Sequence, residues 1–350
     1  MKNLNLLLLF ILNLTLISCG SNSGKKISDF SLSLVDSKSE FQLGETLEVA
    51  VKNPKNREID SVKFYFEDRL LEKSDEISAR LPLNDQKLGN QNIQALVYSD
   101  GNTDSIQIAV KIFNDNPPVI YTYQIINTYP HDQKAYTQGL EFFKDTLYES
   151  TGQYGNSSLR KTNFETGEIL KKVDLADRYF GEGLSVLNDK IYQLTWNEGE
   201  GLIYDITDLK QTGSFKYNQS KEGWGLTNDG EKFYKSDGTE KIWILNGTTL
   251  AEESFIQPTT HRSISTQLNE LEWIEGKIYA NTYQKDGVAI INPTNGAIEG
   301  LINFQGLRDK VTQHPDLDVL NGIAYNPTTK KIYVTGKNWD KLFEVEIIKK

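Results

Sequence analysis

The sequence repeats one short pattern five times after residue 130, and this repeat restricts the possible folds more than any other feature. In each copy a polar or aromatic residue precedes a Gly-Leu step or a variant of it. A tyrosine follows the aliphatic residue after 8 residues in the first four copies and after 10 in the last. Copies begin 42 to 52 residues apart, a period typical of a β-propeller with one blade per repeat. The copies are Gln138-Gly139-Leu140 with Tyr148, Glu182-Gly183-Leu184 with Tyr192, Trp224-Gly225-Leu226 with Tyr234, Asn269-Glu270-Leu271 with Tyr279, and Asn321-Gly322-Ile323 with Tyr333.

Two sets of repeat positions should face one mouth of the central channel, where propellers usually hold their ligands. One set is the residue before each Gly-Leu step, and the other lies four residues after each repeat tyrosine. Together they offer one carboxylate, one ammonium group, several amides and aromatic walls. Such walls exclude water, raise the pKa of a nearby carboxyl and strengthen the remaining polar contacts. The first set is Gln138, Glu182, Trp224, Asn269 and Asn321, and the second is Gly152, Trp196, Gly238, Tyr283 and Lys337.

Composition excludes several classes of function. The net charge of −10 argues against a nucleic acid as partner. One Cys and three His cannot build a disulfide framework and leave too few ligands for a Cys/His zinc site. We therefore expect no metal and no cofactor. Nothing in the sequence demands more than a monomer.

The first residues predict export and a lipid anchor. Lys2 is followed by an apolar run over residues 6–17 and by Leu16-Ile17-Ser18-Cys19-Gly20, the pattern of a lipobox. Residues 1–19 are therefore predicted to be a lipoprotein signal peptide, and residues 20–26 a polar tether. A lipid on Cys19 would anchor the protein to a bacterial membrane, with the periplasmic or surface face left open. The alternative is an ordinary signal peptide cut elsewhere, with Cys19 discarded.

Two domains are expected after the tether. Residues 27–114 alternate apolar and polar side chains over about 90 residues with roughly seven strands, which favours an immunoglobulin-like β-sandwich. No catalytic constellation appears there, so we expect a spacer or docking module. Residues 115–118 follow as a stiff linker that ends in two prolines. Residues 119–350 are predicted to form a five-bladed β-propeller, closed by pairing of the C-terminal strand with the segment after the linker.

Sequence motifs near the repeats carry a resemblance to a known family. They are Tyr129-Pro130-His131-Asp132, Tyr136-Thr137-Gln138-Gly139-Leu140, Phe180-Gly181-Glu182-Gly183-Leu184, Gly223-Trp224-Gly225-Leu226, Ser236-Asp237-Gly238-Thr239, His261-Arg262, Leu268-Asn269-Glu270-Leu271-Glu272, Ile278-Tyr279-Ala280-Asn281, Val319-Leu320-Asn321-Gly322-Ile323-Ala324 and Thr335-Gly336-Lys337. With them, residues 119–350 resemble the five-bladed glutaminyl-peptide cyclotransferases of plants and bacteria. The first 118 residues are not part of this resemblance. Members of the family convert an N-terminal glutamine into pyroglutamate and release ammonia. The resemblance implies the same reaction here, on peptides or proteins that begin with glutamine.

The resemblance also assigns roles to single residues. The acid/base glutamate of the family corresponds to Glu182, its lysine to Lys337 and its asparagine to Asn269. We expect these three to be catalytic. Five further residues are expected to bind the substrate: Gln138, Trp224, Tyr283, Tyr136 and Trp196. Tyr283 stands where plant members have a tryptophan, which leaves the shape of the pocket and its substrate range open.

The reaction explains these residue types. The α-amine of glutamine attacks its own side-chain carbonyl, so holding the folded-back conformer is a large part of the work. One carboxyl beside both nitrogens can carry the proton from the amine to the leaving group, and we assign this role to Glu182. Lys337 and the amide of Asn269 or Gln138 can stabilise the negative charge that develops on the carbonyl oxygen. No metal is required by this scheme.

Several alternatives remain open at this point. Lys337 can instead be an ion-pair partner that keeps Glu182 charged, and Asn269 and Gln138 can cap strand backbones. Trp196 can belong to the core, and Asn321 is assigned to stabilising a turn. A loop with Asp316 and Asp318 is either a structural calcium site or a solvated acidic loop. For the whole domain, the alternatives are a non-catalytic propeller that binds a peptide or small ligand, and a metal-dependent lactone hydrolase.

Overall fold

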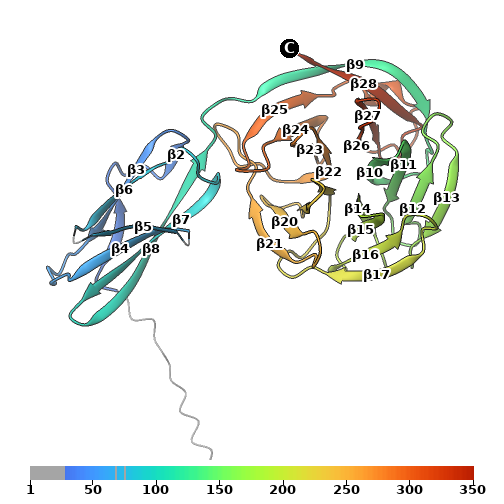
Figure 1. The fold of residues 1–350 in the computed structure, drawn as a ribbon. Helices are drawn as coiled ribbons and strands as arrows, with labels where there is room; N and C mark the ends of the chain where they lie inside the picture. Colours follow the sequence, from blue (N-terminus) through green and yellow to red (C-terminus); the bar gives the residue numbers. More distant parts are fainter. Residues whose placement is uncertain (1–27, 68, 75) are drawn as a thin grey trace, which may run out of the picture.

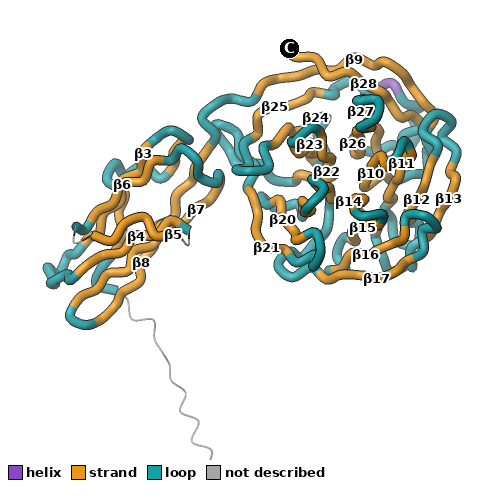
Figure 2. Tube along the Cα trace, viewed as in Figure 1, coloured by secondary structure: helices purple, strands orange, loops and turns teal. Residues whose placement is uncertain are grey.

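The structure is a computed structural model, and it describes residues 28–350 apart from residues 68 and 75. Over this part of the chain the fold is all-β, as predicted, and its helical content is one short 3-10 turn, Arg308–Lys310 (Figure 2). Within the same residues, no helix has the length and apolarity needed to cross a membrane. The predicted signal peptide, Cys19 and the tether lie outside the described residues.

Eight strands of the N-terminal region form two sheets that pack against one another. The three-stranded sheet has the order β1 (Ser31–Leu34), β3 (Thr46–Lys52), β6 (Ser78–Pro82), and the five-stranded sheet has the order β2 (Glu40–Gln42), β8 (Asn102–Phe113), β7 (Gly89–Ser99), β4 (Ser61–Phe66), β5 (Arg69–Ser74). In β3 and β4 every second residue is buried, which confirms the predicted alternation. Leu47, Phe64 and Ile93 lie in the shared core, each fully buried.

The remaining strands form sheets that stand around a common centre (Figure 1). Three are separate sheets of four strands each: β10 (Thr137–Phe143), β11 (Thr146–Thr151), β12 (Ser158–Thr162) and β13 (Ile169–Asp174); β14 (Gly181–Leu187), β15 (Lys190–Thr195), β16 (Glu200–Asp205) and β17 (Gln211–Lys216); β18 (Leu226–Asn228), β19 (Lys232–Ser236), β20 (Ile242–Asn246) and β21 (Glu252–Ile256). An eight-stranded sheet completes the ring, in the order β22 (Leu268–Ile274), β23 (Lys277–Thr282), β24 (Gly287–Ile291), β25 (Ile298–Asn303), β9 (Val119–Pro130), β28 (Lys341–Lys349), β27 (Lys331–Gly336), β26 (Leu320–Asn326). The whole is therefore a nearly closed ring of the β-propeller type.

The two ends of the ring region share one sheet, as predicted. β28 pairs antiparallel with β9 from Lys341 opposite Pro130 to Lys349 opposite Tyr121. β9 also pairs in parallel with β25, over residues 119–121 and 300–302. These pairings cover the edges that an open sheet would expose.

The Gly-Leu steps lie on the innermost strand of each sheet, where neighbouring strands approach one another closely. A Cβ added at Gly139 would lie 2.5 Å from the backbone nitrogen of Leu184, and one added at Gly183 would lie 2.5 Å from that of Leu226. Real Cβ atoms do not approach backbone so closely. The glycine is therefore required by the packing of the ring centre at Gly139 and Gly183, whereas the fourth copy carries Glu270 at the equivalent position. The following leucine is buried in each of these copies.

The N-terminal sheets contact the ring directly. The backbone N–H of Asn90 donates to Oε1 of Gln257 over 2.6 Å, and that of Leu88 donates to the carbonyl of Asn295 over 3.1 Å. Ala297 of the ring packs into the core of the N-terminal sheets. The connection through residues 114–118 is thus supplemented by contacts of Gln257, which follows β21, and of Asn295 and Ala297 on the turn before β25.

Candidate active site

In four of the five repeats the residue before the Gly-Leu step is displaced from the regular ladder of its inner strand, and in the third repeat Trp224 lies just before β18. The register shifts between Thr137 and Gly139, where Gln138 lies, and between Gly181 and Leu184, where Glu182 lies. The same shift surrounds Asn269 and Asn321 in the fourth and fifth repeats. A bulge of this kind re-aims a side chain, which here turns toward one end of the ring centre.

The second set of repeat positions follows directly after the second strand of each sheet. Backbone hydrogen bonds fix these positions beside the bulges: Trp196 N–H donates to the carbonyl of Phe180 over 3.0 Å, and Lys337 N–H donates to that of Val319 over 2.9 Å. Both sets of positions therefore meet at the same end of the ring.

A pocket of about 230 Å³ lies where the two sets meet. All eight residues predicted to form the catalytic and substrate-binding set line it, and they come from all five repeats. Two further residues, Phe180 and Gln153, complete the wall. The lining is Tyr136, Gln138, Gln153, Phe180, Glu182, Trp196, Trp224, Asn269, Tyr283 and Lys337.

Glu182 carries the one carboxylate of this pocket lining, and the side chain is 4% exposed. Its Oε1 accepts a hydrogen bond from Nε2 of Gln138 over 2.9 Å, and its Oε2 is buried without a partner among the described residues. Burial raises the pKa of the Glu182 carboxyl well above its ordinary value, whereas the Lys337 charge lowers it and the Glu222 and Glu198 charges raise it further. A carboxyl with a raised pKa and one free oxygen can both accept and return a proton.

A hydrogen bond from Asn321 holds the side-chain amide of Gln138 in position. Its Oε1 accepts a hydrogen bond from Nδ2 of Asn321 over 3.1 Å, and Asn321 also donates to the carbonyl of Thr137 over 2.9 Å. This fixes the amide so that its N–H group faces Glu182. The hypothesis that Gln138 caps a strand backbone finds no such contact, and Asn321 supports the pocket beyond the turn-stabilising role that we expected.

Lys337 lies between two aromatic faces. Its Nζ is 4.7 Å from the ring centroid of Tyr136 and 5.5 Å from that of Tyr283. Among the described residues it forms no ion pair with Glu182, so the interpretation of Lys337 as a direct ion-pair partner is not supported. Burial lowers the pKa of Lys337, and the nearby Glu182 and Asp318 charges raise it. The ammonium group is held by ring faces and remains available to a ligand.

Aromatic side chains enclose most of the pocket. Edge-to-face contacts join Tyr136 to Phe180 (centroids 6.1 Å apart), Phe180 to Trp196 (5.5 Å) and Trp224 to Tyr283 (5.7 Å). Trp196, for which a core position was the alternative, thus lines the pocket. Such a wall excludes water from the bound ligand and strengthens polar contacts inside it.

Glu222 joins the two indole rings of this wall. One of its oxygens, Oε2, accepts the indole N–H of Trp196 over 2.7 Å and that of Trp224 over 2.8 Å. The carboxylate therefore fixes the orientation of both rings from outside the pocket. It also contributes to the raised pKa of Glu182.

Asn269 has a side-chain amide without a hydrogen-bond partner in the described part of the chain. The residue is 4% exposed and lines the pocket, while its backbone carbonyl accepts the hydroxyl hydrogen of Ser236 over 2.7 Å. A buried amide without a protein partner is available to a ligand. The hypothesis that this amide caps a strand backbone is not supported by the contacts.

The sequence analysis missed Phe180, Gln153 and Glu222. A signal for two of them exists, because the residue three positions before the glycine of the Gly-Leu step follows the alternation of a strand. Tyr136 precedes Gln138 in this way, as Phe180 precedes Glu182 and Glu222 precedes Trp224. Gln153 lies in a loop with φ of 95°, and no repeat pattern marks it.

The loop with Asp316 and Asp318 forms part of the surroundings. Oδ2 of Asp318 accepts the hydroxyl hydrogen of Tyr136 over 2.9 Å, and Asp316 is exposed. In residues 28–350, with 68 and 75 left out, no group of three or more His, Cys, Asp or Glu has the arrangement of a metal site. Asp318 therefore positions a wall of the pocket.

Comparisons with known proteins agree with this geometry. Glutaminyl-peptide cyclotransferase of Arabidopsis thaliana is 39% identical over 230 residues, which cover 64% of this chain and 71% of that protein. The crystal structure of Myxococcus xanthus glutaminyl cyclase matches with a TM-score of 0.62 at 33% sequence identity, over 67% of this chain and 99% of that one. A family model for glutamine cyclotransferase matches residues 95–347, which begins inside β7 and so reaches further forward than the motifs indicated. The chain belongs to the glutamine cyclotransferase family.

Proposed function

We propose that this protein is a glutaminyl-peptide cyclotransferase, which closes the N-terminal glutamine of a peptide or protein into pyroglutamate and releases ammonia. The observation that carries the proposal is Oε2 of Glu182, a buried carboxyl oxygen without a partner in the described part of the chain. The same pocket presents the Lys337 cation and the Asn269 amide. The names of the Arabidopsis and Myxococcus relatives support the same reaction.

The proposed chemistry transfers one proton from nitrogen to nitrogen. The neutral α-amine of the substrate attacks the carbonyl carbon of its own side chain, which forms the C–N bond of the five-membered ring. Glu182 accepts a proton from this nitrogen and gives it to the side-chain nitrogen. The bond to that nitrogen then breaks, and ammonia leaves.

The other pocket residues stabilise this sequence. Negative charge develops on the carbonyl oxygen when the amine attacks, and the Lys337 ammonium group and the Asn269 amide are donors for it. The rings of Trp224 and Tyr283 hold the aliphatic part of the glutamine. Gln138 keeps Glu182 in position through its hydrogen bond of 2.9 Å. No step in this scheme uses a metal, so we expect full activity in the presence of chelators.

The test is ammonia release from glutaminamide and from peptides that begin with glutamine, with an N-acetylated peptide as blocked control. We expect Glu182→Gln to lower kcat by about 10²- to 10⁴-fold, because the amide cannot carry the proton. Glu141→Gln is a matched control, since it changes the same atoms on a neighbouring inner strand outside the pocket. A binding module without catalysis would release no ammonia in any variant and would keep its peptide affinity in Glu182→Gln.

Two finer assignments of fold belong to the same proposal. We assign the ring to the five-bladed β-propellers, since the eight-stranded sheet consists of two four-stranded halves beside three separate four-stranded sheets. The N-terminal pair of sheets, over residues 27–114, is assigned to the immunoglobulin-like sandwiches because its eight strands pack as two sheets around one core. Residues 115–118 form the linker, and residues 119–350 the catalytic domain. The front domain serves as a spacer or docking module.

The lipid anchor rests on the sequence of the first residues. We infer that the signal peptide over residues 1–19 directs export, that Cys19 carries the lipid, and that residues 20–26 tether the enzyme to a bacterial membrane. Cys19→Ala should move the protein from the membrane fraction to the soluble exported fraction and abolish incorporation of a labelled fatty acid. Equal labelling of the variant and the unaltered protein would contradict the anchor.

A further inference from the structure

A groove of about 900 Å³ adjoins the pocket and has no place in the scheme above. It shares Tyr136 and Gln153 with the pocket, which is several times smaller at about 230 Å³. The barrier between the two cavities is thin at Gly152, where an added Cβ would lie 2.3 Å from the Phe180 ring. The groove therefore borders the pocket at Tyr136, Gln153 and Gly152.

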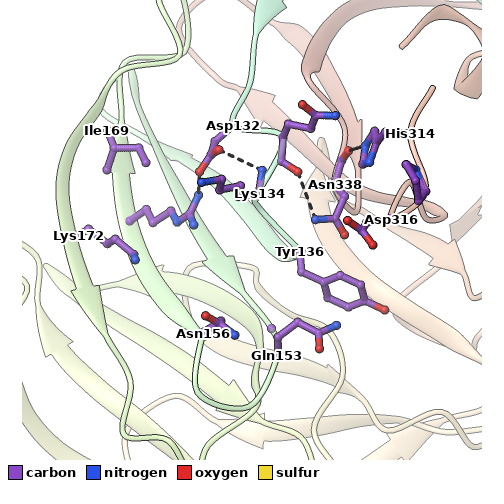
Figure 3. A pocket seen from close by; sticks show the side chains of 14 residues that line it. Asp132, Lys134, Tyr136, Gln153, Asn156, Ile169, Lys172, His314, Asp316 and Asn338 are labelled. Atoms are coloured by element: carbon purple, nitrogen blue, oxygen red, sulfur yellow. Dashed lines mark hydrogen bonds and ion pairs between the residues drawn. The ribbon is translucent and has the colours of Figure 1, made fainter. Parts of the chain in front are cut away.

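The residues that line the groove come from the first and last sheets of the ring and from their loops. One side is formed by the loops around β10 and β11 and by Ile169 and Lys172 of the outermost strand β13. The other side is formed by residues 314–316 and by Asn338, on the loops that flank β26 and β27. The groove therefore leads from the ring centre to the periphery between the first and last sheets (Figure 3). A peptide whose first residue fills the pocket needs such an exit.

We propose that this groove binds the residues that follow the N-terminal glutamine, and that it favours acidic side chains at the third and fourth positions of the substrate. The inference deepens the proposed function and rests on it.

Unpaired amides line the groove. In the part of the chain that the structure describes, the side-chain amides of Gln133, Gln153 and Asn156 form no hydrogen bond with the protein, and Gln153 and Asn156 are exposed. A side-chain amide offers a donor and an acceptor, as a peptide backbone does, so each can pair with an extended chain. Gln153 stands at the junction with the pocket, in a backbone conformation (φ of 95°) that residues other than glycine rarely adopt. Strain of this kind is often retained at ligand sites.

The charges of the groove differ between its two ends. Asp316 lies on the loop of Asp318, which bonds to Tyr136 of the pocket, so the near end is acidic. Lys134 is exposed, and among the described residues its ammonium group forms no ion pair, although its backbone N–H donates to Oδ1 of Asp132 over 3.0 Å. Lys172 also lines the groove; it is exposed, and its Nζ lies 2.6 Å from Oδ1 of Asp174.

The third cation of the groove is already neutralised. Arg160 is buried, and its Nη1 lies 2.8 Å from Asp132 and 3.7 Å from Glu149. Among the described cations that line the groove, Lys134 is thus the one without an ion pair, and in our proposal it faces the third or fourth residue of the substrate. This arrangement attracts an acidic side chain at the third or fourth position and does not favour one at the second.

The experiment compares kcat/KM for glutaminamide with that for Gln-Ala-Glu-Glu, Gln-Ala-Ala-Ala and Gln-Ala-Lys-Lys amides on the full-length protein. We expect the acidic peptide to exceed the basic one by about two- to fivefold at low salt, the range of an exposed ion pair, with the difference falling as salt is added. Lys134→Glu should reverse the preference and leave glutaminamide turnover unchanged, because Lys134 does not line the pocket.

Lys144→Glu provides the matched control. Lys144 is an exposed lysine at the opposite end of the β10–β11 hairpin, so this variant changes the net charge equally without touching the groove. The inference would be overturned if both variants had the same ratio of kcat/KM for the acidic and basic peptides, or if the unaltered protein turned over all three peptides with equal kcat/KM. In either case, turnover of glutaminamide would still support the proposed function. Absence of ammonia from every substrate would overturn both.

Discussion

Neighbouring charges of opposite sign shift the pKa of the Glu182 carboxyl in opposite directions. Burial and the Glu222 and Glu198 carboxylates raise its pKa, and the Lys337 cation lowers it. In the proposed reaction Glu182 must first be ionised to accept a proton from the amine. The rate should therefore rise with pH through the pKa of Glu182, and the neighbouring charges decide where this acidic limb of the pH profile lies.

Removing the positive charge of Lys337 and removing the negative charge of Glu222 should shift the acidic limb of the pH profile in opposite directions. Lys337→Met removes the cation that lowers the pKa, so the acidic limb of kcat/KM should move to higher pH; the rate should also fall by about 10²-fold or more with the loss of a donor. Glu222→Gln removes a charge that raises the pKa, so the limb should move to lower pH, while the amide oxygen still accepts an indole hydrogen. The measurement is a pH profile of kcat/KM for both variants on one substrate. Shifts in the same direction would show that another group titrates.

At the level of residues, much of the site could be predicted because it lies on the repeat. Gln138, Glu182 and Asn269 occupy equivalent positions in different copies, so their convergence follows from the ring. Gln153 could not be predicted, since its place depends on a loop conformation and not on a periodic strand. The double hydrogen bond of Glu222 was also hidden, because it joins side chains from different loops.

Among the elements, the inner strands depend on residues without a Cβ at their closest approach. Gly183→Ala would place a methyl group 2.5 Å from the backbone nitrogen of Leu226. Because backbone cannot move aside as a flexible side chain does, we expect the free energy of unfolding to fall by about 1–3 kcal/mol or more. Chemical denaturation measures this change.

Gly213→Ala provides the comparison on an outer strand. A Cβ there meets nothing nearer than the Ile203 side chain at 3.7 Å, which is ordinary contact. Gly213 lies on β17, and alanine should be neutral or slightly stabilising at this position. A loss at Gly213 as large as at Gly183 would show that close approach at the ring centre is not the cause.

Two buried glutamates of β22 accept hydrogen bonds from backbone N–H groups of β26. Oε2 of Glu270 accepts the backbone N–H of Ile323 over 3.0 Å, and Oε1 of Glu272 accepts that of Tyr325 over 2.8 Å. Burial raises the pKa of both carboxyls well above the ordinary value. Both glutamates belong to the fourth repeat. Their hydrogen bonds could not be predicted, because strand alternation does not show which backbone groups of another strand lie opposite a side chain.

On the scale of the whole molecule, the described residues contain separate cores. One lies between the two N-terminal sheets around Phe64, and another lies in the last sheet of the ring around Phe343. The hydrogen bond between Asn90 and Gln257 is among the few that join the two parts. The parts should therefore unfold in two transitions that calorimetry can resolve.

Each transition should respond to its own core. Phe343→Ala should remove about 3–5 kcal/mol from the stability of the ring and lower one transition only. Phe64→Ala, an equal truncation of a side chain that is 0% exposed, should lower only the other. A single transition that moves as a whole in both variants would show that the contacts at Gln257 couple the parts into one unit.

Of the two strand pairings that close the ring, the sequence predicted one and not the other. The sequence indicated that the chain end pairs with the segment after the linker, and β28 does pair with β9. The parallel pairing of β9 with β25 was not foreseen, because only the path of the backbone brings residues 119–121 beside residues 300–302. The contact of Ala297 with the N-terminal core escaped prediction for the same reason.

The long pairing of β9 with β28 has a mechanical consequence. Tension that is transmitted through the linker reaches the ring along β9, which lies antiparallel to β28 from Lys349 opposite Tyr121 to Lys341 opposite Pro130. A pull along the strand loads these hydrogen bonds side by side, in shear, so that they must break together and not one after another. The ring would therefore keep its shape when the chain is stretched from its front end, and the pocket at its centre would stay unloaded.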